Sequence, residues 1–91
     1  MLEVLLSSPN DAWRDDAAMQ LTESSDPYEA ENALVFAINS GRLDSSLRQT
    51  CAESLGTIWA RAGMVTPTLR DLIQEPELTT ALAYFAALTR R

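Results

Sequence analysis

The chain has 91 residues, 46% of them hydrophobic, and its 13 carboxylates against seven arginines give a net charge of −6. This size and composition predict one small folded domain spanning residues 1–91, and the negative charge disfavours binding to nucleic acid. The chain has no histidine and one cysteine, which excludes an internal disulfide and a Cys/His zinc site.

The sequence carries no membrane signal. No apolar stretch approaches the roughly 20 residues needed to span a bilayer, and no basic amphipathic helix is present to lie on its surface. The first residues, Met-Leu-Glu-Val-Leu-Leu, lack the basic leader and the apolar length of a secretory signal. We therefore expect a cytoplasmic protein with no membrane partner.

Prolines and acidic caps divide the chain into helices. Each of the four prolines fits the first turn of a helix, where the missing N–H costs nothing. Asp26 and Asp44 are predicted N-caps, and Gly41 and Gly63 lie where left-handed C-terminal caps are expected. After a short turn at 2–7, the predicted helices cover residues 9–23, 27–40, 45–62, 67–74 and 76–89.

Apolar residues in these segments recur at helical spacing. The 27–40 segment carries one such stripe, formed by Ala30, Ala33, Leu34, Ala37 and Ile38. The 45–62 segment contains Gly56, which costs roughly 1 kcal/mol against alanine inside a helix and is reasonable only where a neighbouring helix comes close. The last segment is expected to cover one end of the fold with Leu78, Ala81, Leu82, Phe85, Ala86 and Leu88.

A pattern near the start of the chain returns 34 residues later. Residues 10–21 match residues 44–55, and the matched pairs include Trp13 with Leu47, Arg14 with Arg48, and Leu21 with Leu55. A period in this range is typical of stacked helical units, each of which buries its apolar face against the next.

The second copy, Leu47-Arg48-x-x-Cys51-Ala52-x-x-Leu55-Gly56-x-Ile58, resembles the first helix of a HEAT-like repeat. The resemblance implies an all-α fold, a short right-handed αα-superhelix of HEAT-like repeats with about five helices over residues 9 to 90. Two features depart from the family: the stack is very short, and the third unit has Leu82 in place of the motif arginine. A generic helical bundle is the alternative.

Catalytic chemistry is not expected from these residues. Nucleophilic catalysis by serine or cysteine normally needs a base, and the usual one, histidine, is absent. Cys51 falls on the buried stripe of its helix and is predicted to be a small core residue. Asp11 and Asp15 are one helical turn apart without a calcium-binding loop, so a solvated face is predicted. We expect no enzyme activity, no cofactor and no metal.

Protein recognition remains, and an acidic segment marks a candidate surface. Residues 11–31 hold seven carboxylates against Arg14 alone; such a patch attracts basic surfaces, and a role in solubility is the alternative. On the 27–40 segment, aromatic and amide residues lie opposite the core stripe, and the resemblance would place them on the partner-facing side. The predicted partner-binding residues are Asp15, Asp16, Glu23, Asp26, Tyr28, Glu29, Glu31, Asn32 and Phe36.

Three aromatic residues have two interpretations each. Phe36 would also be explained by packing against a neighbouring repeat. Trp59 and Tyr84 are secondary candidates for partly exposed anchors, with burial in the core as the favoured interpretation.

Two functions fit these features. Small acidic chains without catalytic residues resemble bacterial immunity proteins of toxin–immunity systems such as contact-dependent growth inhibition. This resemblance implies an acidic protein-binding module that binds and neutralises a cognate toxin, a basic nuclease-type domain. The alternative is a HEAT-like adaptor or structural module that acts by homodimerisation or by docking to a larger assembly. The sequence does not identify the partner, the oligomeric state, or whether an active site or an exosite would be blocked.

Overall fold

In the computed structural model, residue 20 and residues 26–90 are described. This part of the chain is helical and contains no strand, which confirms the all-α fold class. The helices are α3 (Pro27–Asn39), α4 (Ser45–Ala62), α5 (Pro67–Arg70) and α6 (Glu77–Thr89). The predicted turn at 2–7 and nearly all of the predicted helix at 9–23 lie outside the described residues.

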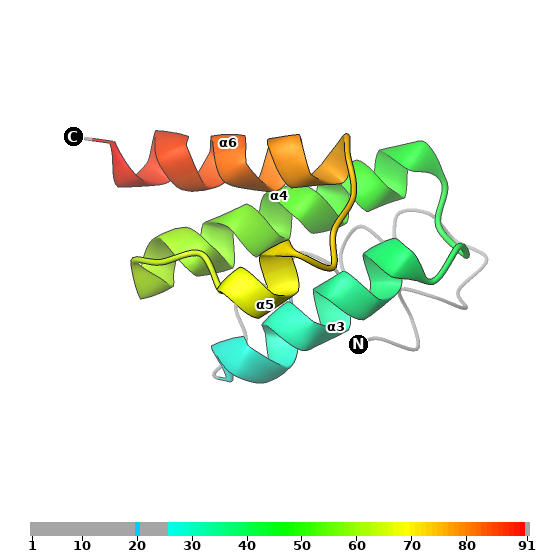
Figure 1. The fold of residues 1–91 in the computed structure, drawn as a ribbon, viewed down its shortest axis with the longest axis horizontal. Helices are drawn as coiled ribbons and strands as arrows, with labels where there is room; N and C mark the ends of the chain where they lie inside the picture. Colours follow the sequence, from blue (N-terminus) through cyan, green and yellow to red (C-terminus); the bar gives the residue numbers. More distant parts are fainter. Residues whose placement is uncertain (1–19, 21–25, 91) are drawn as a thin grey trace.

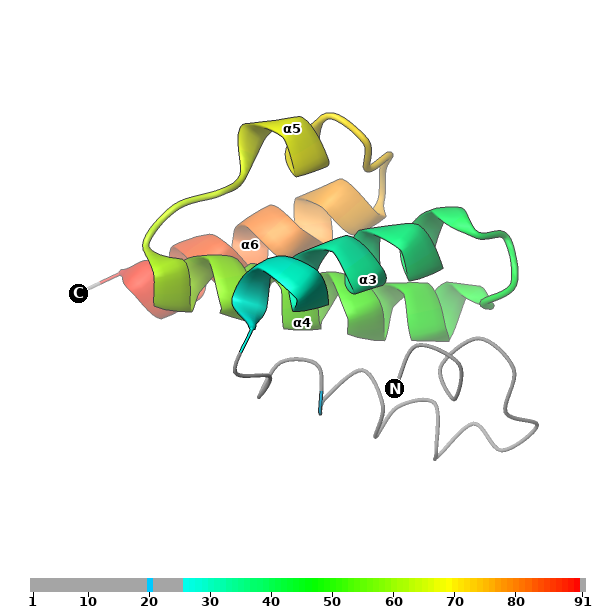
Figure 2. The same ribbon diagram turned by 90° about the horizontal axis from the view of Figure 1, so that it is seen from below.

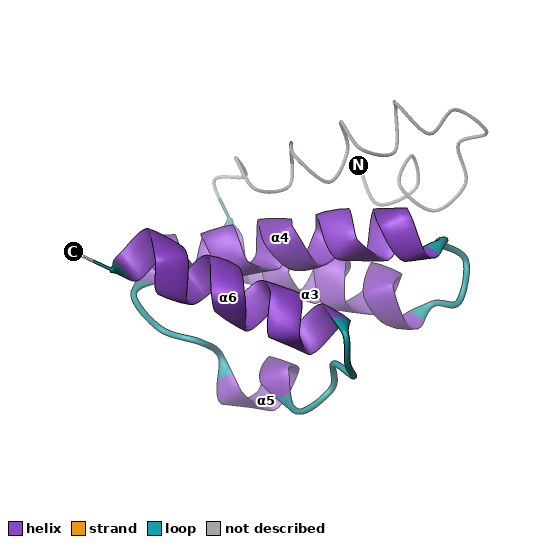
Figure 3. Ribbon diagram, turned by 90° about the horizontal axis from the view of Figure 1, so that it is seen from above, coloured by secondary structure: helices purple, strands orange, loops and turns teal. Residues whose placement is uncertain are grey.

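Three of these helices lie side by side, with α4 between α3 and α6 (Figure 1). Helices α4 and α6 run in the same direction, and α3 runs in the opposite direction (Figure 1). Viewed from below, the short helix α5 lies to one side of the three longer helices (Figure 2), and the view from above shows the same arrangement (Figure 3). None of the helices in the described part of the chain is both long and apolar enough to cross a bilayer.

The predicted helix ends are largely confirmed. The side chain of Asp26 accepts a hydrogen bond from the backbone N–H of Glu29, and that of Asp44 accepts one from Leu47. Each bond satisfies a donor that the first turn of a helix leaves without a partner. Gly63 ends α4 in the left-handed conformation, with φ of 80°, where a side chain would be strained.

The predicted helix at 67–74 is wrong in its length, because α5 ends at Arg70. Beyond it the chain tightens into turns in which the N–H groups of Leu72 and Ile73 each bond to a carbonyl three residues back. This path buries the Ile73 side chain beside that of Leu69, so tertiary packing outweighs local helix propensity here. The final helix begins at Glu77 instead of Pro76.

The core is built around α4, whose buried residues face α3 on one side and α6 on the other. Trp59, Leu34, Leu55 and Cys51 are its largest fully buried side chains. Trp59 is therefore a core residue and not a partly exposed anchor. The apolar stripe predicted for the 27–40 segment is buried as expected, except that Ala33 is half-buried.

Gly56 lies where α4 and α6 come closest. A Cβ atom at this position would overlap the carbonyl oxygen of Ala81 and would approach the Tyr84 Cβ to 2.7 Å. Both contacts belong to α6, so the absence of a side chain at Gly56 permits the two helices to meet at their backbones. The prediction that a neighbouring helix approaches this glycine is confirmed.

Polar bonds fix the first turns of α6 against α4. The Arg48 Nε donates to the Oε1 of Glu77 at 2.7 Å, and its Nη1 donates to the Leu43 carbonyl at 2.6 Å. The hydroxyl of Thr80 donates to the side-chain oxygen of Gln49. The Glu77 carboxylate is buried and holds a charged partner, as a buried carboxylate requires.

The second half of α6 is much less buried than its composition predicts. Ala81 is fully buried, and Leu78, Leu82 and Phe85 pack partly against the core. Ala86 and Leu88, which were expected to cover one end of the fold, are exposed. The physical reason is that α6 contacts one long helix, α4, and therefore buries one side only.

Candidate partner-binding face

The predicted recognition surface of α3 is exposed in the structure. Tyr28 is 72% exposed and Phe36 is 60% exposed, and Glu29, Asn32 and Asn39 are exposed with them. These positions lie opposite the buried stripe of the same helix, because successive residues advance about 100° around a helix axis. Packing of Phe36 against a neighbouring helix, the alternative, is wrong for the described part of the fold.

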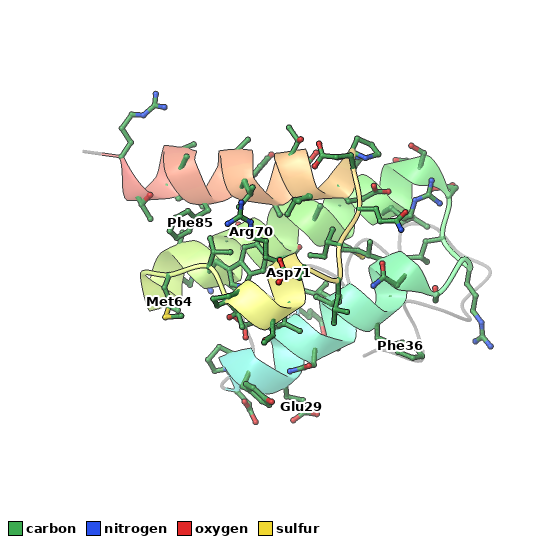
Figure 4. The ribbon with its side chains drawn as sticks, in the orientation of Figure 1. Glu29, Phe36, Met64, Arg70, Asp71 and Phe85 are labelled. Carbon is green, nitrogen blue, oxygen red and sulfur yellow. The ribbon has the colours of Figure 1, made fainter. Side chains whose placement is uncertain are left out.

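Figure 4 shows how this surface is presented. The side chains of Glu29 and Phe36 project outward from α3, away from α4 (Figure 4). Asn32 is held in place by a bond of 2.8 Å from its Nδ2 to the Tyr28 carbonyl. The exposed side of α3 therefore combines two aromatic rings with amide and carboxylate groups.

The segment around α5 completes the surface with residues that sequence reasoning missed. Leu72 is 57% exposed and lies in the part of the predicted helix at 67–74 that is not helical. The Asn39 Nδ2 donates to the Leu72 carbonyl at 2.9 Å, which holds the turn after α5 beside the end of α3. Only the breakdown of helical periodicity after Arg70 could have indicated this exposure.

Between α3 and α5 lies a groove of about 450 Å³. It is lined by Asn32, Val35, Phe36, Asn39, Ser40, Leu69 and Leu72. We call the groove together with Tyr28 and Glu29 the α3–α5 face. Its centre is apolar and its edges are amides and a carboxylate, a composition that suits the core and rim of a protein interface.

Glu31 is not part of this face, contrary to the sequence prediction. Its side chain is buried, 7% exposed, and its Oε1 accepts a hydrogen bond of 2.9 Å from the hydroxyl of Thr66. Thr66 precedes α5 and makes no side-chain cap for that helix, because its hydroxyl is engaged by Glu31. The carboxylate thus positions α5 against α3 and is not available to a partner.

The remaining acidic candidates fall into two groups. Asp15, Asp16 and Glu23 lie outside the described residues. Asp26 is exposed and caps α3, with its Oδ1 at 3.1 Å from the Glu29 backbone nitrogen. Six of the predicted partner-binding residues are carboxylates. Among those that the structure describes, Glu29 alone is exposed and has no capping or packing role.

Charge is divided unevenly between the two sides of the described fold. The segments that carry the α3–α5 face, 26–39 and 66–76, contain one arginine, Arg70, and five carboxylates: Asp26, Glu29, Glu31, Asp71 and Glu75. Helices α4 and α6, taken through Arg90, contain three arginines against two carboxylates. Of the five carboxylates, Glu29 belongs to the α3–α5 face, Glu31 is buried, and none lines the groove itself.

A second cavity, of about 580 Å³, lies near the start of α6. Arg48, Glu75 and Glu77 are among its lining residues. The Arg48 guanidinium is already engaged by Glu77 and by the Leu43 carbonyl, and the two carboxylates repel anions. Among the described residues, no three potential metal ligands come together.

Comparison with family models, with curated proteins and with solved structures finds no match for the chain. What the α3–α5 face can do therefore follows from its own geometry. It presents an apolar groove, two exposed rings and a negative surround, and these features suit binding of a protein surface more than chemistry on a small molecule.

Proposed function

We propose that the chain is an acidic protein-binding module that neutralises a basic protein through the α3–α5 face. The observation that carries this proposal is the coincidence of exposed Tyr28, Phe36 and Leu72 with the more acidic side of the fold. Aromatic side chains in a pocket often supply most of the energy of an interface. Surrounding charge raises the rate of association and selects partners of opposite sign.

The partner that fits best is a nuclease-type toxin domain, which makes this chain an immunity protein. A nuclease needs a positive cleft to hold the phosphate backbone of its substrate, and a chain of net charge −6 is attracted to such a cleft. The lone cysteine is buried, as suits a reducing cytoplasm, which is where a toxin of this class would have to be neutralised.

We further propose that the fold is a short right-handed αα-superhelix of HEAT-like repeats. The shared direction of α4 and α6 (Figure 1) supports it, because equivalent helices of stacked units run parallel. The repeat-motif arginine, Arg48, bonds to Glu77 at the start of the next unit. In this arrangement α3 and α5 are the second helices of their pairs, and they carry the partner-facing side.

The test is a titration of the full chain against the toxin-like domain encoded next to its gene, at low and at high salt. We expect tight one-to-one binding that weakens as salt rises and that abolishes the toxicity of the domain, because exposed charges are screened by salt. Absence of binding at either salt concentration contradicts the immunity function. Salt-insensitive docking to another assembly would favour the adaptor function instead.

A further inference from the structure

The second cavity, of about 580 Å³, adjoins the groove of the α3–α5 face. Asn39 and Leu72 line both of them. The bond of 2.9 Å from the Asn39 Nδ2 to the Leu72 carbonyl joins the end of α3 to the connection between α5 and α6, which crosses over α4 (Figure 1). The groove and the cavity therefore share one wall, and a single segment of a partner can reach both.

The groove and the second cavity differ in chemistry. No ionisable side chain lines the groove, and its apolar lining residues are Val35, Phe36, Leu69 and Leu72. The second cavity is lined by the amides of Asn39 and Gln74 and by the charged side chains of Arg48, Glu75 and Glu77. An apolar side chain of a partner suits the groove, and a polar one suits the second cavity.

The charges that line the second cavity favour a cation. The Arg48 Nε donates to the Oε1 of the buried Glu77 at 2.7 Å, so these two charges offset each other. Glu75 is exposed, and its Oε2 accepts from the hydroxyl of Thr79, a neutral group that leaves the carboxylate charge in place. Arg42 follows the lining residue Gly41 but does not line the cavity. One negative charge therefore remains, and it attracts a positive group.

The acceptors around the cavity suit a guanidinium group. The Oδ1 of Asn39 accepts no hydrogen bond among the described residues, because the Nδ2 of the same amide is the atom that bonds to Leu72. The exposed amide of Gln74 adds a second neutral oxygen. A guanidinium carries five donors and no acceptor, so it can bond to these oxygens and to the Glu75 carboxylate together.

We propose that the second cavity binds an arginine side chain of the basic partner, while the adjoining groove takes an apolar side chain of the same partner segment. The inference rests on the proposed function, since this partner is the protein that the α3–α5 face binds. It adds the chemistry of the recognised segment, an arginine near a large apolar residue. The Arg48–Glu77 pair holds the start of α6 against α4 and so positions Glu75, two residues before the helix.

The first experiment uses no partner protein. The full chain, labelled with ¹⁵N, is titrated with N-acetyl-arginine amide and, as a neutral control of similar shape, with N-acetyl-citrulline amide. We expect the arginine compound to shift the signals of Asn39, Gln74 and Glu75, and citrulline to shift them much less. Glu75→Gln should reduce the arginine effect, and its side-chain oxygen can still accept from Thr79. Equal shifts with both compounds, or none up to about 100 mM, overturn the arginine site.

The second experiment asks whether the partner uses this site. Glu75→Gln should weaken binding to the toxin-like domain by about two- to tenfold. The control, Asp71→Asn, removes the same charge from an exposed residue that lines neither the groove nor the cavity, and it should have a much smaller effect. Circular dichroism of each variant checks that it is folded.

The two experiments separate this inference from the proposed function. Equal losses of affinity for Glu75→Gln and Asp71→Asn overturn the arginine contact, while binding of the unmodified chain to the toxin-like domain still supports the proposed function. Selective binding of the arginine compound by a chain that does not bind the toxin-like domain supports the arginine site and contradicts the immunity function.

Discussion

The α3–α5 face and the second half of α6 both expose large hydrophobic side chains, yet they differ in what surrounds them. The segments that carry Tyr28, Phe36 and Leu72 hold five carboxylates, of which Glu31 is buried. Tyr84 and Leu88 belong to the α4–α6 pair, in which arginines slightly outnumber carboxylates. Exposed apolar area supplies affinity at either place. Under the proposed function, surrounding charge, and not apolar area, is what would favour a basic protein at the α3–α5 face.

The largest effect should come from removing the ring at the centre of the α3–α5 face. We expect Phe36→Ala to weaken binding to the toxin-like domain by about 2–4 kcal/mol, roughly 30- to 1,000-fold in the dissociation constant. Isothermal titration calorimetry gives this value directly. Leu88→Ala removes a similarly exposed side chain, 56% against 60%, and should bind like the unmodified chain. Equal losses of affinity in both variants would contradict the assignment of partner binding to the α3–α5 face.

The next effect tests the packing of α6 against α4 at Gly56. Gly56→Ala improves helix propensity, yet we expect it to destabilise the fold by about 1–3 kcal/mol, because the added methyl group meets the backbone of Ala81. Thermal and urea unfolding measure the change. The control, Thr57→Ala, alters the next and half-exposed position and should change stability by less, about 0.5–1 kcal/mol for its bond to Glu53.

The same variant tests whether the α4–α6 contact affects binding at the α3–α5 face. The Gly56 contact joins α4 to α6, and α3 lies on the other side of α4 (Figure 1). Folded Gly56→Ala protein should therefore bind the toxin-like domain unchanged. A stability gain of the size that helix propensity predicts would show that α6 moves away from α4 at low cost.

The parts of this comparison that sequence could predict are those set by neighbouring residues. The caps at Asp26 and Asp44 and the buried stripe of α3 depend on spacings of three or four residues, and these are confirmed. Gly56 was informative because a glycine inside a helix has a known cost that close packing can explain. The exposed positions of Tyr28, Asn32 and Phe36 follow from the same helical period.

The parts that sequence could not predict depend on contacts between distant residues. The burial of Glu31 requires Thr66, 35 positions away, and no local pattern marks that pair. The short α5 and the exposed Leu72 follow from the path that buries Ile73. In α6 the apolar residues surround the helix, so periodicity selects no side, and only the packing against α4 shows which side is left open.

A smaller effect tests whether the association rate depends on the charge of the α3–α5 face or on the net charge of the chain. Glu29→Gln should lower the association rate with the toxin-like domain by about two- to fivefold, because the exposed carboxylate lies on the α3–α5 face. Glu53→Gln makes the same chemical change on α4 and the same change in net charge, keeps a side-chain oxygen that can accept from the Tyr84 phenol, and should alter the rate much less. Stopped-flow kinetics at low salt distinguish them. Equal slowing of both variants would mean that net charge alone steers association.

Asp26 is unsuitable for this comparison, although it lies on the same helix. Its carboxylate caps α3, and loss of such a cap costs about 1 kcal/mol of stability. A change in binding at this position would therefore mix helix stability with partner contact. Glu29 has no such role as a side chain, which is why the matched pair uses it.

The smallest effect concerns Tyr84, where α6 meets α4. The negative charge of Glu53 raises the pKa of the Tyr84 phenol, and partial burial and a hydrogen bond to the same carboxylate raise it further. Because the folded pKa lies above the unfolded value near 10, the stability from this contact is complete below about pH 10 and is lost as pH rises through the raised pKa. Glu53→Gln should move the pKa back toward the usual value.

Absorbance titration of tyrosinate measures this shift, in a Tyr28→Phe background so that Tyr84 is the remaining tyrosine of the two. An unchanged Tyr84 pKa in the Glu53→Gln variant would show that the phenol does not face α4. A lowered pKa would instead place the Tyr84 hydroxyl against Glu53, so that its ring is partly committed within the subunit.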